Sequence, residues 1–164
     1  MSFREKILDV VEQEGAMDGI AIRAIRNDED LWYATVECQL GEGQDAFVNP
    51  AGFSIGRAYL KPEENVPCVI LRDGERIGFI MLRRWALGGD VATWSYYIDH
   101  REQGKGYGET AARLAVKILK TALPDYTIKL AVEQDNLRGQ RLYTRIGFQK
   151  TEELDGDDLV FAHW

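Results

Sequence analysis

The stretch "IDHREQGKGYGETAARLAVKILK", residues Ile98–Lys120, places three glycines at alternate positions directly before a long amphipathic segment. Small and apolar side chains recur at helical spacing over 108–122, which predicts a helix that begins at the last of these glycines. Glycines before a helix leave backbone N–H groups accessible at the positive end of the helix dipole, where they can bind a phosphate. A simple turn is the alternative interpretation of this stretch taken alone.

Two common phosphate-binding motifs do not fit the glycine stretch. A Walker A loop needs a glycine where Asp99 stands and a serine or threonine where Gly106 stands. The dinucleotide fingerprint GxGxxG fails because Glu109 occupies the position of the third glycine. The pattern therefore requires another explanation.

Strand and helix patterns continue on both sides of this stretch. The aromatic and β-branched segment 91–99 and the segment 127–132, which follows Pro124, predict two strands that flank the helix. A hairpin is predicted about Asp73-Gly74, a pair that suits the positive φ of a tight turn. The patterns also predict helices over 3–14, from Asn27, over 51–61 and over 136–147, a strand over 19–25, and a final hairpin about 155–158.

Composition limits the class of protein. A chain of 164 residues with 45% hydrophobic residues fits one globular domain, and we expect an amino-terminal helical extension over 1–18 before a single domain over 19–164. A net charge of −7 argues against binding to nucleic acid. No apolar run approaches about 20 residues and the first 15 residues are charged throughout, so we expect a soluble, cytoplasmic protein without a membrane partner.

The cysteines do not suggest a metal centre. Cys38 and Cys68 lie neither in a CxxC pair nor in a Cys/His ligand spacing, so we expect two reduced, structural thiols and no metal. The acidic run from Glu152 to Asp158 is interpreted as a solvated hairpin.

Two ordered motifs resemble one known family. "REQGKG", Arg101 to Gly106, fits the R/Q-x-x-G-x-G/A signature of the GNAT superfamily of N-acetyltransferases, and it lies between a predicted strand and a predicted helix. A second block in the next predicted helix matches the family pattern V-x-x-x-N-x-x-A-x-x-L-Y-x-x-x-G-F at Val132, Asn136, Leu142, Tyr143, Gly147 and Phe148. Over roughly residues 20–164 the chain therefore resembles a GNAT acetyltransferase.

The resemblance implies the fold. It is of the α+β class, in three α/β layers: a mixed central sheet of six to seven strands, flanked by helices, with a splay between two parallel strands. These two strands would be 91–99 and 127–133. The stretches "FVNPAGFSIGRAYLK" and "WSYYIDHREQGKGYG" are similar to the bacterial diamine and polyamine (spermidine/spermine-type) N-acetyltransferase group. Ser95 stands where that group usually has arginine, which leaves the amine specificity open.

The resemblance also implies a site for acetyl-CoA as co-substrate. The pantetheine arm would lie in the splay against backbone groups of Tyr97 and Ile98, and the pyrophosphate would bind at the loop that follows. Asn136 would contact the cofactor arm, although an ordinary helix N-cap is the alternative. The cofactor-binding residues implied in this way are Tyr97, Ile98, Arg101, Gln103, Gly104, Lys105, Gly106, Tyr107, Gly108 and Asn136.

Tyr143 is the catalytic residue that the resemblance implies, as the acid that protonates the departing thiolate. The alternative for Tyr143 is a half-buried helix aromatic. An alkylammonium group is neutral in only about one molecule in 2,500 at pH 7, so the attacking amine needs a base. Asp90, Glu133 or a water chain to one of them are the candidates that the sequence leaves open.

The acceptor is the least defined part of the prediction. The resemblance implies transfer to a primary amine of a small cationic substrate, such as a diamine or polyamine. Other acceptors (an amino acid, an aminoglycoside or a protein N-terminus) and a non-catalytic acyl-CoA-binding module are the alternatives. Carboxylates and aromatic faces that could bind an amine are Glu37, Glu42, Asp45, Trp94 and Tyr96, each with a solvated loop or a core position as its alternative. A homodimer would be in keeping with the resemblance.

Overall fold

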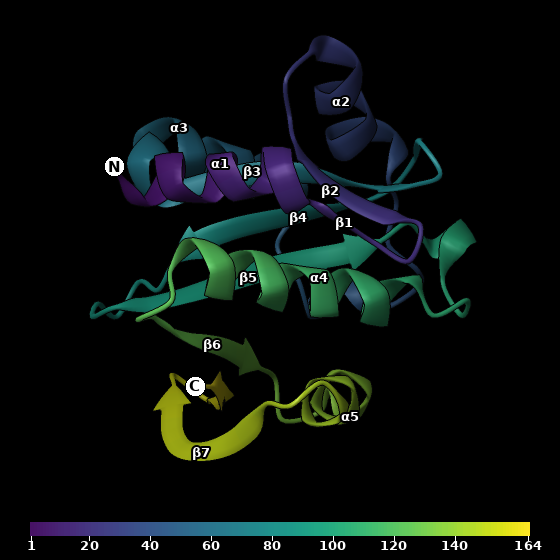
Figure 1. Ribbon diagram of the computed structural model, residues 1–164. Coiled ribbons are helices and arrows are strands. Elements are labelled where there is room, and N and C mark those ends of the chain that lie inside the picture. Colours follow the sequence, from purple (N-terminus) through teal and green to yellow (C-terminus); the bar gives the residue numbers. More distant parts are fainter.

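A computed structural model describes residues 1–164, apart from the side chain of Ala46. Its described strands form one mixed sheet in the order β1-β2-β3-β4-β5-β6-β8-β7 (Figure 1). The strands are β1 (Ala16–Met17), β2 (Ile20–Ala24), β3 (Asn65–Arg72), β4 (Glu75–Arg84), β5 (Val91–Ile98), β6 (Thr127–Val132), β7 (Gln149–Asp155) and β8 (Asp158–His163). The helices are α1 (Phe3–Glu14), α2 (Asp28–Trp32), α3 (Ala51–Leu60), α4 (Tyr107–Ala122) and α5 (Leu137–Arg145).

Shorter helical turns complete the chain. A π-helical turn, Tyr33–Glu37, extends α2 directly, and 3₁₀ turns occupy Gln44–Ala46, Pro62–Glu64 and His100–Glu102. The segment from Glu37 to the start of α3 thus connects two helices that lie on one face of the sheet.

The expected mixed α/β fold is confirmed, with one strand more than the six to seven expected. The additional strand is β1, whose two residues pair with the first residues of β2 through a turn at Asp18 and Gly19. Such a short strand has no periodicity that a sequence pattern can reveal.

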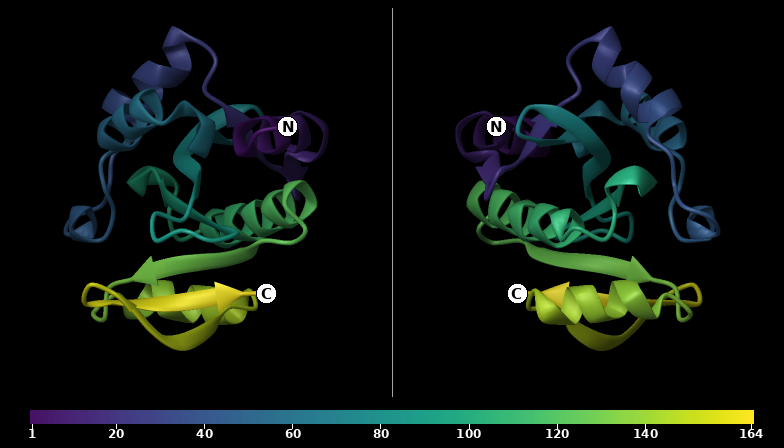
Figure 2. Two further views of the ribbon diagram at one scale, coloured as in Figure 1. Left: turned by 90° about the vertical axis from the view of Figure 1, so that its left-hand side faces the viewer. Right: turned by 90° about the vertical axis from the view of Figure 1, so that its right-hand side faces the viewer.

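The parallel pair β5 and β6 separates soon after it begins. Its register comprises Val91 with Thr127 and Ala92 with Ile128. Beyond these pairs each strand continues with its other neighbour, because β5 pairs with β4 up to Ile98 and β6 pairs with β8 up to Val132. Figure 2 shows the result as two parts of one sheet, β1–β5 and β6–β8, that diverge from a common corner. The expected splay is therefore present.

Helices cover both faces of the larger part of the sheet. The main core contains the buried faces of α1 and α4 together with residues of β2 to β6 and β8 (Figure 1). On the opposite face, Phe79 and Met81 of β4 pack against Ala51 and Ala58 of α3. One face of β5 therefore packs in the main core with α4, and the other lies on the side of α3.

The amino-terminal helix α1 belongs to the main core. Ser2 caps it through a reciprocal capping box with Glu5, and Phe3, Ile7 and Val11 are buried against the sheet and α4. Residues 1–18 therefore share a hydrophobic core with residues 19–164.

A buried carboxylate joins α2 to two strands. Asp30 is fully buried and accepts hydrogen bonds from Arg23 Nη1 of β2 at 2.6 Å and from Arg76 Nε of β4 at 2.8 Å. The backbone N–H of Arg26 adds a third at 3.2 Å. Burial alone would raise the pKa of this carboxyl, but the two guanidiniums outweigh it and lower the pKa to about 2.

We predict that Asp30→Asn lowers the free energy of unfolding by about 2–3 kcal/mol at pH 7. The folded-state pKa of Asp30 lies below the unfolded-state value near 3.8. Its contribution is therefore present above about pH 4 and lost as the pH falls toward 2. In urea unfolding, the difference between wild type and variant should shrink to about half between pH 7 and pH 3. A difference that stays constant over this range would contradict the prediction.

Candidate active site

The register of β4 with β5 fixes which way the main chain of β5 points. Asp99 N donates to Ile77 O at 2.7 Å, and Trp85 N donates to Val91 O at 2.9 Å. The paired residues between them alternate along the same antiparallel register. In such a ladder, alternate residues direct their N–H and C=O groups to opposite sides of the strand. The even-numbered residues of β5 therefore direct their main-chain groups away from β4.

These main-chain groups face the gap that opens between β5 and β6. Trp94, Tyr96 and Ile98 follow the last parallel pair, so their main chains line the gap on the β5 side. Tyr97 is paired with Phe79, and its main chain faces β4 instead. The geometry thus favours Tyr96 over Tyr97 beside Ile98, and a cofactor contact by Ile98 stays a prediction.

The glycine loop requires glycine for its backbone conformation. Gly104 has φ +79° and Gly106 has φ +84°, and a Cβ at either position would meet nothing within 4 Å. The left-handed conformation, and not crowding, thus selects glycine at both positions. Gly106 is the N-cap of α4 and provides no side chain to cap the helix. The first-turn N–H groups of this 16-residue helix are therefore accessible to an anion.

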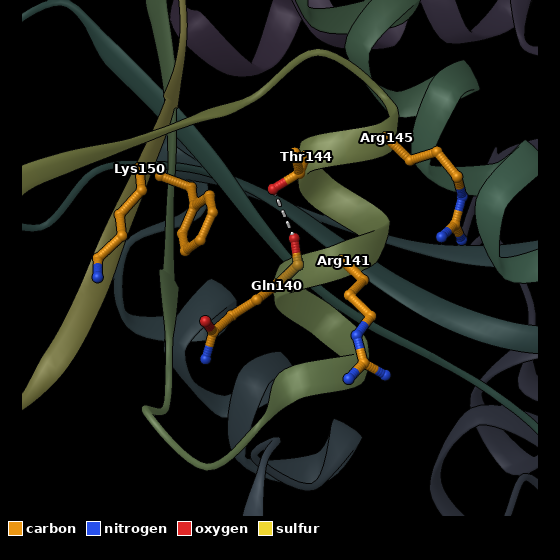
Figure 3. Close-up of a pocket in the computed structure, with 6 residues that line it drawn as sticks. Gln140, Arg141, Thr144, Arg145 and Lys150 are labelled. Carbon is orange, nitrogen blue, oxygen red and sulfur yellow. Dashed lines mark hydrogen bonds between the residues drawn. The ribbon is translucent and has the colours of Figure 1, made fainter.

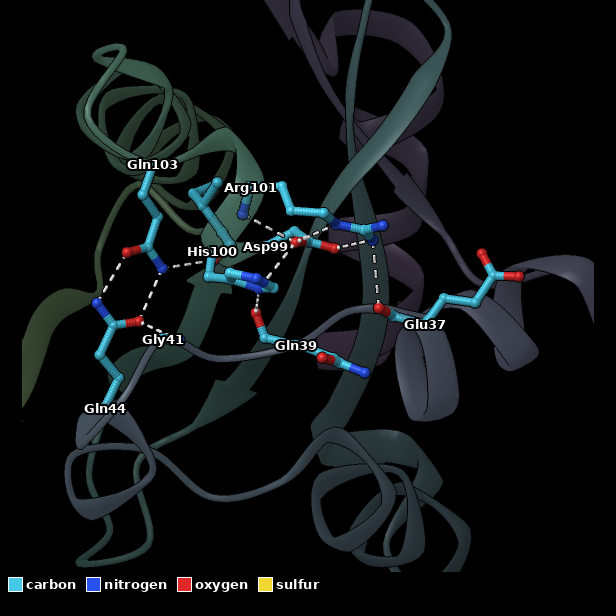
Figure 4. Close-up of polar contacts among 9 residues, drawn as sticks. Glu37, Gln39, Gly41, Gln44, Asp99, His100, Arg101 and Gln103 are labelled. Atoms are coloured by element: carbon cyan, nitrogen blue, oxygen red, sulfur yellow. Dashed lines mark hydrogen bonds and ion pairs between the residues drawn. The ribbon is translucent and has the colours of Figure 1, made fainter.

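The side chain of Arg101 is engaged within the protein (Figure 4). Asp99 is 2% exposed, and Arg101 donates to it from Nη2 at 2.6 Å and from Nε at 3.0 Å. Arg101 Nη2 also donates to the carbonyl of Glu37 at 3.4 Å. Burial opposes the charge of Asp99, but the bonds from Arg101 outweigh it and hold the pKa of Asp99 below its usual value. Arg101 thus connects the loop to the segment after α2.

Gln103 makes a second connection to the same segment (Figure 4). Its side-chain amide donates to Ile98 O at 2.8 Å and exchanges two 2.8 Å hydrogen bonds with Gln44. Gln44 also accepts from Gly41 N at 2.9 Å. Residues 37–44 are thereby held against the glycine loop.

The remaining loop residues offer mainly their backbone. Lys105 is half-exposed and pairs with Glu102 at 3.1 Å. The ring of Tyr107 lies under Arg72, 4.8 Å from its guanidinium carbon. Gly108 accepts a hydrogen bond from the Tyr96 hydroxyl through its carbonyl at 3.0 Å. An anion at this loop would therefore meet main-chain N–H groups first.

Asn136 is the N-cap of α5, as its alternative interpretation predicted. Its Oδ1 accepts from Gly139 N at 2.9 Å. Within the described part of the chain its side-chain nitrogen donates to no residue. That nitrogen remains available to a ligand, and a cofactor contact by Asn136 stays a prediction.

Tyr143 lies in an aromatic cluster at the β5 side of α5. Its ring centroid is 6.4 Å from that of Trp94 and 5.8 Å from that of Phe148. Burial raises the pKa of the phenol well above the ordinary value of 10, and the nearby Glu133 carboxylate adds to the effect. Tyr143 therefore keeps its proton at neutral pH and can donate a hydrogen bond from its hydroxyl.

Two carboxylates with raised pKa values lie where β6 ends. Glu133 follows Val132, which pairs with Leu159, so Glu133 lies beside Asp158 at the start of β8. Burial raises the pKa of Glu133, and the Asp158 charge raises it further. Burial also raises the pKa of Asp158, together with Asp155 and Asp157. A carboxylate with a raised pKa is a better base near neutral pH.

Asp90 is in a different position. It precedes β5 at the closed end of the gap, its side chain is 71% exposed, and its nearest cation is Arg84 Nη2 at 3.9 Å. Of the two candidate bases, the geometry therefore favours Glu133.

The family model that describes the Acetyltransferase (GNAT) family matches residues 27–148 of this chain. The match covers α2 to the end of α5 and includes both sides of the gap. The chain belongs to this family.

Individual relatives agree with that assignment. A spermine/spermidine N(1)-acetyltransferase of Bacillus subtilis is 30% identical over 95 residues, which are 54% of this chain and 62% of that protein. The chain thus matches less than two thirds of the length of this relative. The acetyltransferase from Agrobacterium tumefaciens shares the fold with a TM-score of 0.69 at 16% identity, covering 91% of this chain and 92% of the other. An aminoglycoside acetyltransferase in complex with coenzyme A has a TM-score of 0.68 at 20% identity, covering 87% and 92%.

The side chains proposed from the sequence to bind an amine are dispersed in this GNAT domain. Glu37, Glu42 and Asp45 are exposed on the segment after α2. Trp94 is 5% exposed and packs into the main core, as does Tyr96 in part. Both rings therefore point away from α3, and the core interpretation of the two aromatics is confirmed.

Three residues near the gap were missed from the sequence. Asp99 and Gln44 hold Arg101 and Gln103, and no local motif indicates either. Arg138, in the first turn of α5, lies close enough to Tyr96 to lower the pKa of that phenol, against the larger effect of burial. A basic residue in the first turn after Asn136 was the available signal.

Two cavities lie elsewhere on the described surface. One of about 470 Å³ lies between α5 and strands β7 and β8 and is lined by Gln140, Arg141, Thr144, Arg145, Lys150 and Phe161 (Figure 3). Another of about 990 Å³ lies beside α1 and β2. Among the described residues, no group of three His, Cys, Asp or Glu side chains is placed to hold a metal ion. None of the described helices is long and apolar enough to cross a membrane.

We predict that Asp99→Asn loosens the segment 37–44, because Arg101 loses the carboxylate that fixes it. The free energy of unfolding should fall by about 1–3 kcal/mol, and amide hydrogen exchange of residues 37–44 should accelerate about tenfold. Asp90→Asn is the matched control, since its exposed pair with Arg84 should contribute less than about 0.5 kcal/mol. Equal exchange of this segment in both variants would show that Asp99 does not hold it.

Proposed function

We propose that the protein is an acetyl-CoA-dependent N-acetyltransferase that acts on a primary amine. The observation that carries the proposal is the gap between β5 and β6, which is lined by main-chain groups and leads to the uncapped start of α4. Membership of the acetyltransferase family and a related fold with bound coenzyme A support it.

The residues at the gap suit this co-substrate. The amide arm of coenzyme A resembles a strand, so the main chain of Trp94, Tyr96 and Ile98 can bond to it as to a neighbouring strand. The first-turn N–H groups of α4 and the Arg138 side chain would bind the phosphates. Asn136 would donate its free amide to the arm. Acetyl-CoA supplies the acetyl group as a thioester.

Glu133 is the base in this proposal. It lies at the end of β6 with a raised pKa, so it can take the proton that an alkylammonium group must lose before its nitrogen attacks. The new C–N bond then forms as the C–S bond breaks. Main-chain N–H groups of β5 that face the gap are placed to stabilise the negative charge on the carbonyl oxygen.

Tyr143 is the acid. Its buried phenol retains its proton at neutral pH and lies against Trp94, the first residue whose main chain faces the open gap. It would donate this proton to the leaving sulfur. The nitrogen loses two protons in all. Glu133 takes the first and releases it to solvent, and the second, lost after the attack, replaces the proton that Tyr143 gives to the sulfur.

The acceptor is a small primary amine in this proposal. The Bacillus relative is named for spermine and spermidine, so polyamines are among the candidate acceptors. Other acceptors remain in the same reaction class, so a thiol-release assay should include putrescine, spermidine and spermine beside amino acids and an aminoglycoside. The proposal would be contradicted if none of these amines caused the release of coenzyme A.

We predict that Gly106→Ala weakens acetyl-CoA binding at least tenfold, because the strained φ would distort the first turn of α4. Gly88→Ala is the matched control, since Gly88 also has positive φ (+90°) and open space but lies in the β4–β5 loop. Both variants should lose about 1 kcal/mol of stability from the left-handed backbone. Isothermal titration with acetyl-CoA measures the difference. Equal affinities for the two variants would remove the loop from the binding site.

We predict that Tyr143→Phe lowers kcat by about 10²–10⁴-fold while the Kd for acetyl-CoA changes less than about threefold. The phenylalanine keeps the packing against Trp94 and Phe148 and removes only the proton donor. Steady-state kinetics and titration separate the two quantities. An unchanged kcat would exclude Tyr143 as the acid.

A further inference from the structure

Arg83 stands beside the closed end of the gap, on the face that α3 covers. It lies in β4 opposite Thr93 of β5. Side chains alternate along a strand, so Arg83 shares the face of Phe79 and Met81, which pack against α3. The last parallel pair of β5 involves Ala92, next to Thr93. Arg83 therefore lies beside the closed end of the gap, beyond the stretch of β5 whose main chain faces the open gap.

The guanidinium of Arg83 has no fixed partner. It is half-buried, and within the described chain no hydrogen bond or ion pair involves it. Burial lowers the pKa of Arg83, and the nearby Arg57 of α3 lowers it further. Both effects mean that the positive charge is poorly solvated and is repelled by a second cation.

Other arginines of this protein are fixed by protein oxygens. The partly buried Arg23 and Arg76 bind the buried Asp30, and the exposed Arg101 binds the buried Asp99. The partly buried Arg4 donates to the carbonyl of Asn65 at 2.8 Å. Arg83 has no such partner among the described residues, so no hydrogen bond or ion pair within the protein accounts for its position.

The opposite side of the gap is acidic. Asp155 and Asp158 pair across the turn between β7 and β8, and Asp158 lies beside Glu133. Asp155 is near enough to favour the charged form of Arg83, yet the two do not form an ion pair. Arg83 and Arg57 thus lie near Asp155, which pairs with Asp158 beside the end of β6.

We infer that the acceptor is a small zwitterionic amine, in which a carboxylate binds Arg83 while the amino group faces Glu133 and Asp158. This inference rests on the proposed function and names the substrate class of the same site. A guanidinium fork suits a carboxylate in a bidentate arrangement, and partial burial strengthens the contact. The second ammonium of a diamine would instead meet Arg83 and Arg57, two like charges.

Matched acceptors of equal chain length test the inference with the purified full chain. The pairs are 4-aminobutanoate with 1,4-diaminobutane, and 5-aminopentanoate with 1,5-diaminopentane. The measured quantity is kcat/KM for coenzyme A release at saturating acetyl-CoA. We expect the amino acid of each pair to be preferred at least tenfold. Arg83→Gln should reduce kcat/KM for the amino acids about 10–100-fold and leave the diamines unchanged or improved.

Three further variants make the result specific. Arg84→Gln removes the same charge one residue later, on the opposite face, and should leave the preference unchanged. Arg83→Lys keeps the charge without the fork and should restore part of the activity. Arg57 is exposed, so Arg57→Gln should leave the protein folded. We expect this variant to lower kcat/KM for the amino acids about threefold, which would support the site even if Arg83→Gln were unstable.

Two results would overturn the inference. A preference for the diamines would reject the zwitterionic class if the ratio of kcat/KM for amino acid and diamine were unchanged in Arg83→Gln and Arg57→Gln. The acetyltransferase function would remain supported. If titration shows that acetyl-CoA binds but none of the tested amines causes release of coenzyme A, both the proposed function and the inference are rejected.

Discussion

The early end of pairing between β5 and β6 is the constraint on which the site depends. Each strand is held on its other side over its whole length, β5 by β4 and β6 by β8. The two antiparallel ladders can diverge without loss of their own hydrogen bonds, and the parallel contact stops at Ala92 and Ile128. Exposed main-chain edges of this kind bind extended partners. The gap is therefore a rigid feature made by two ladders.

The gap separates two chemical environments. On the face of α4 and α5, aromatic packing buries Tyr143 and keeps its phenol neutral. On the face of α3, Arg83 lies near Arg57 and Asp155. The proposed base Glu133 directly precedes α5, and its carboxylate is near enough to raise the pKa of the proposed acid Tyr143.

The backbone of the glycine loop was partly predictable because its residues lie in one continuous stretch before a helix. Gly104 and Gly106 take left-handed conformations that glycine adopts readily, and Asn136 caps the next helix as its alternative interpretation predicted. The role of Arg101 was less predictable, because its partner Asp99 is two residues away in sequence but its other contact, Glu37, lies 64 residues away. The surroundings of Arg83 were equally hard to predict, because the nearby charges of Arg57 and Asp155 belong to other elements. Local patterns specify backbone conformations, whereas side-chain partners depend on tertiary packing.

Because the protein carries a net negative charge, the absence of a carboxylate partner for Arg83 among the described residues is informative. With 27 acidic and 20 basic residues, carboxylates are in excess. The partly buried Arg23 and Arg76 and the exposed Arg101 each bind a buried carboxylate. An acidic surface would also attract a polycation without any specific site, so net charge cannot select between a diamine and an amino acid. Selection must come from a local charge of the opposite sign, and Arg83 supplies one at the closed end of the gap.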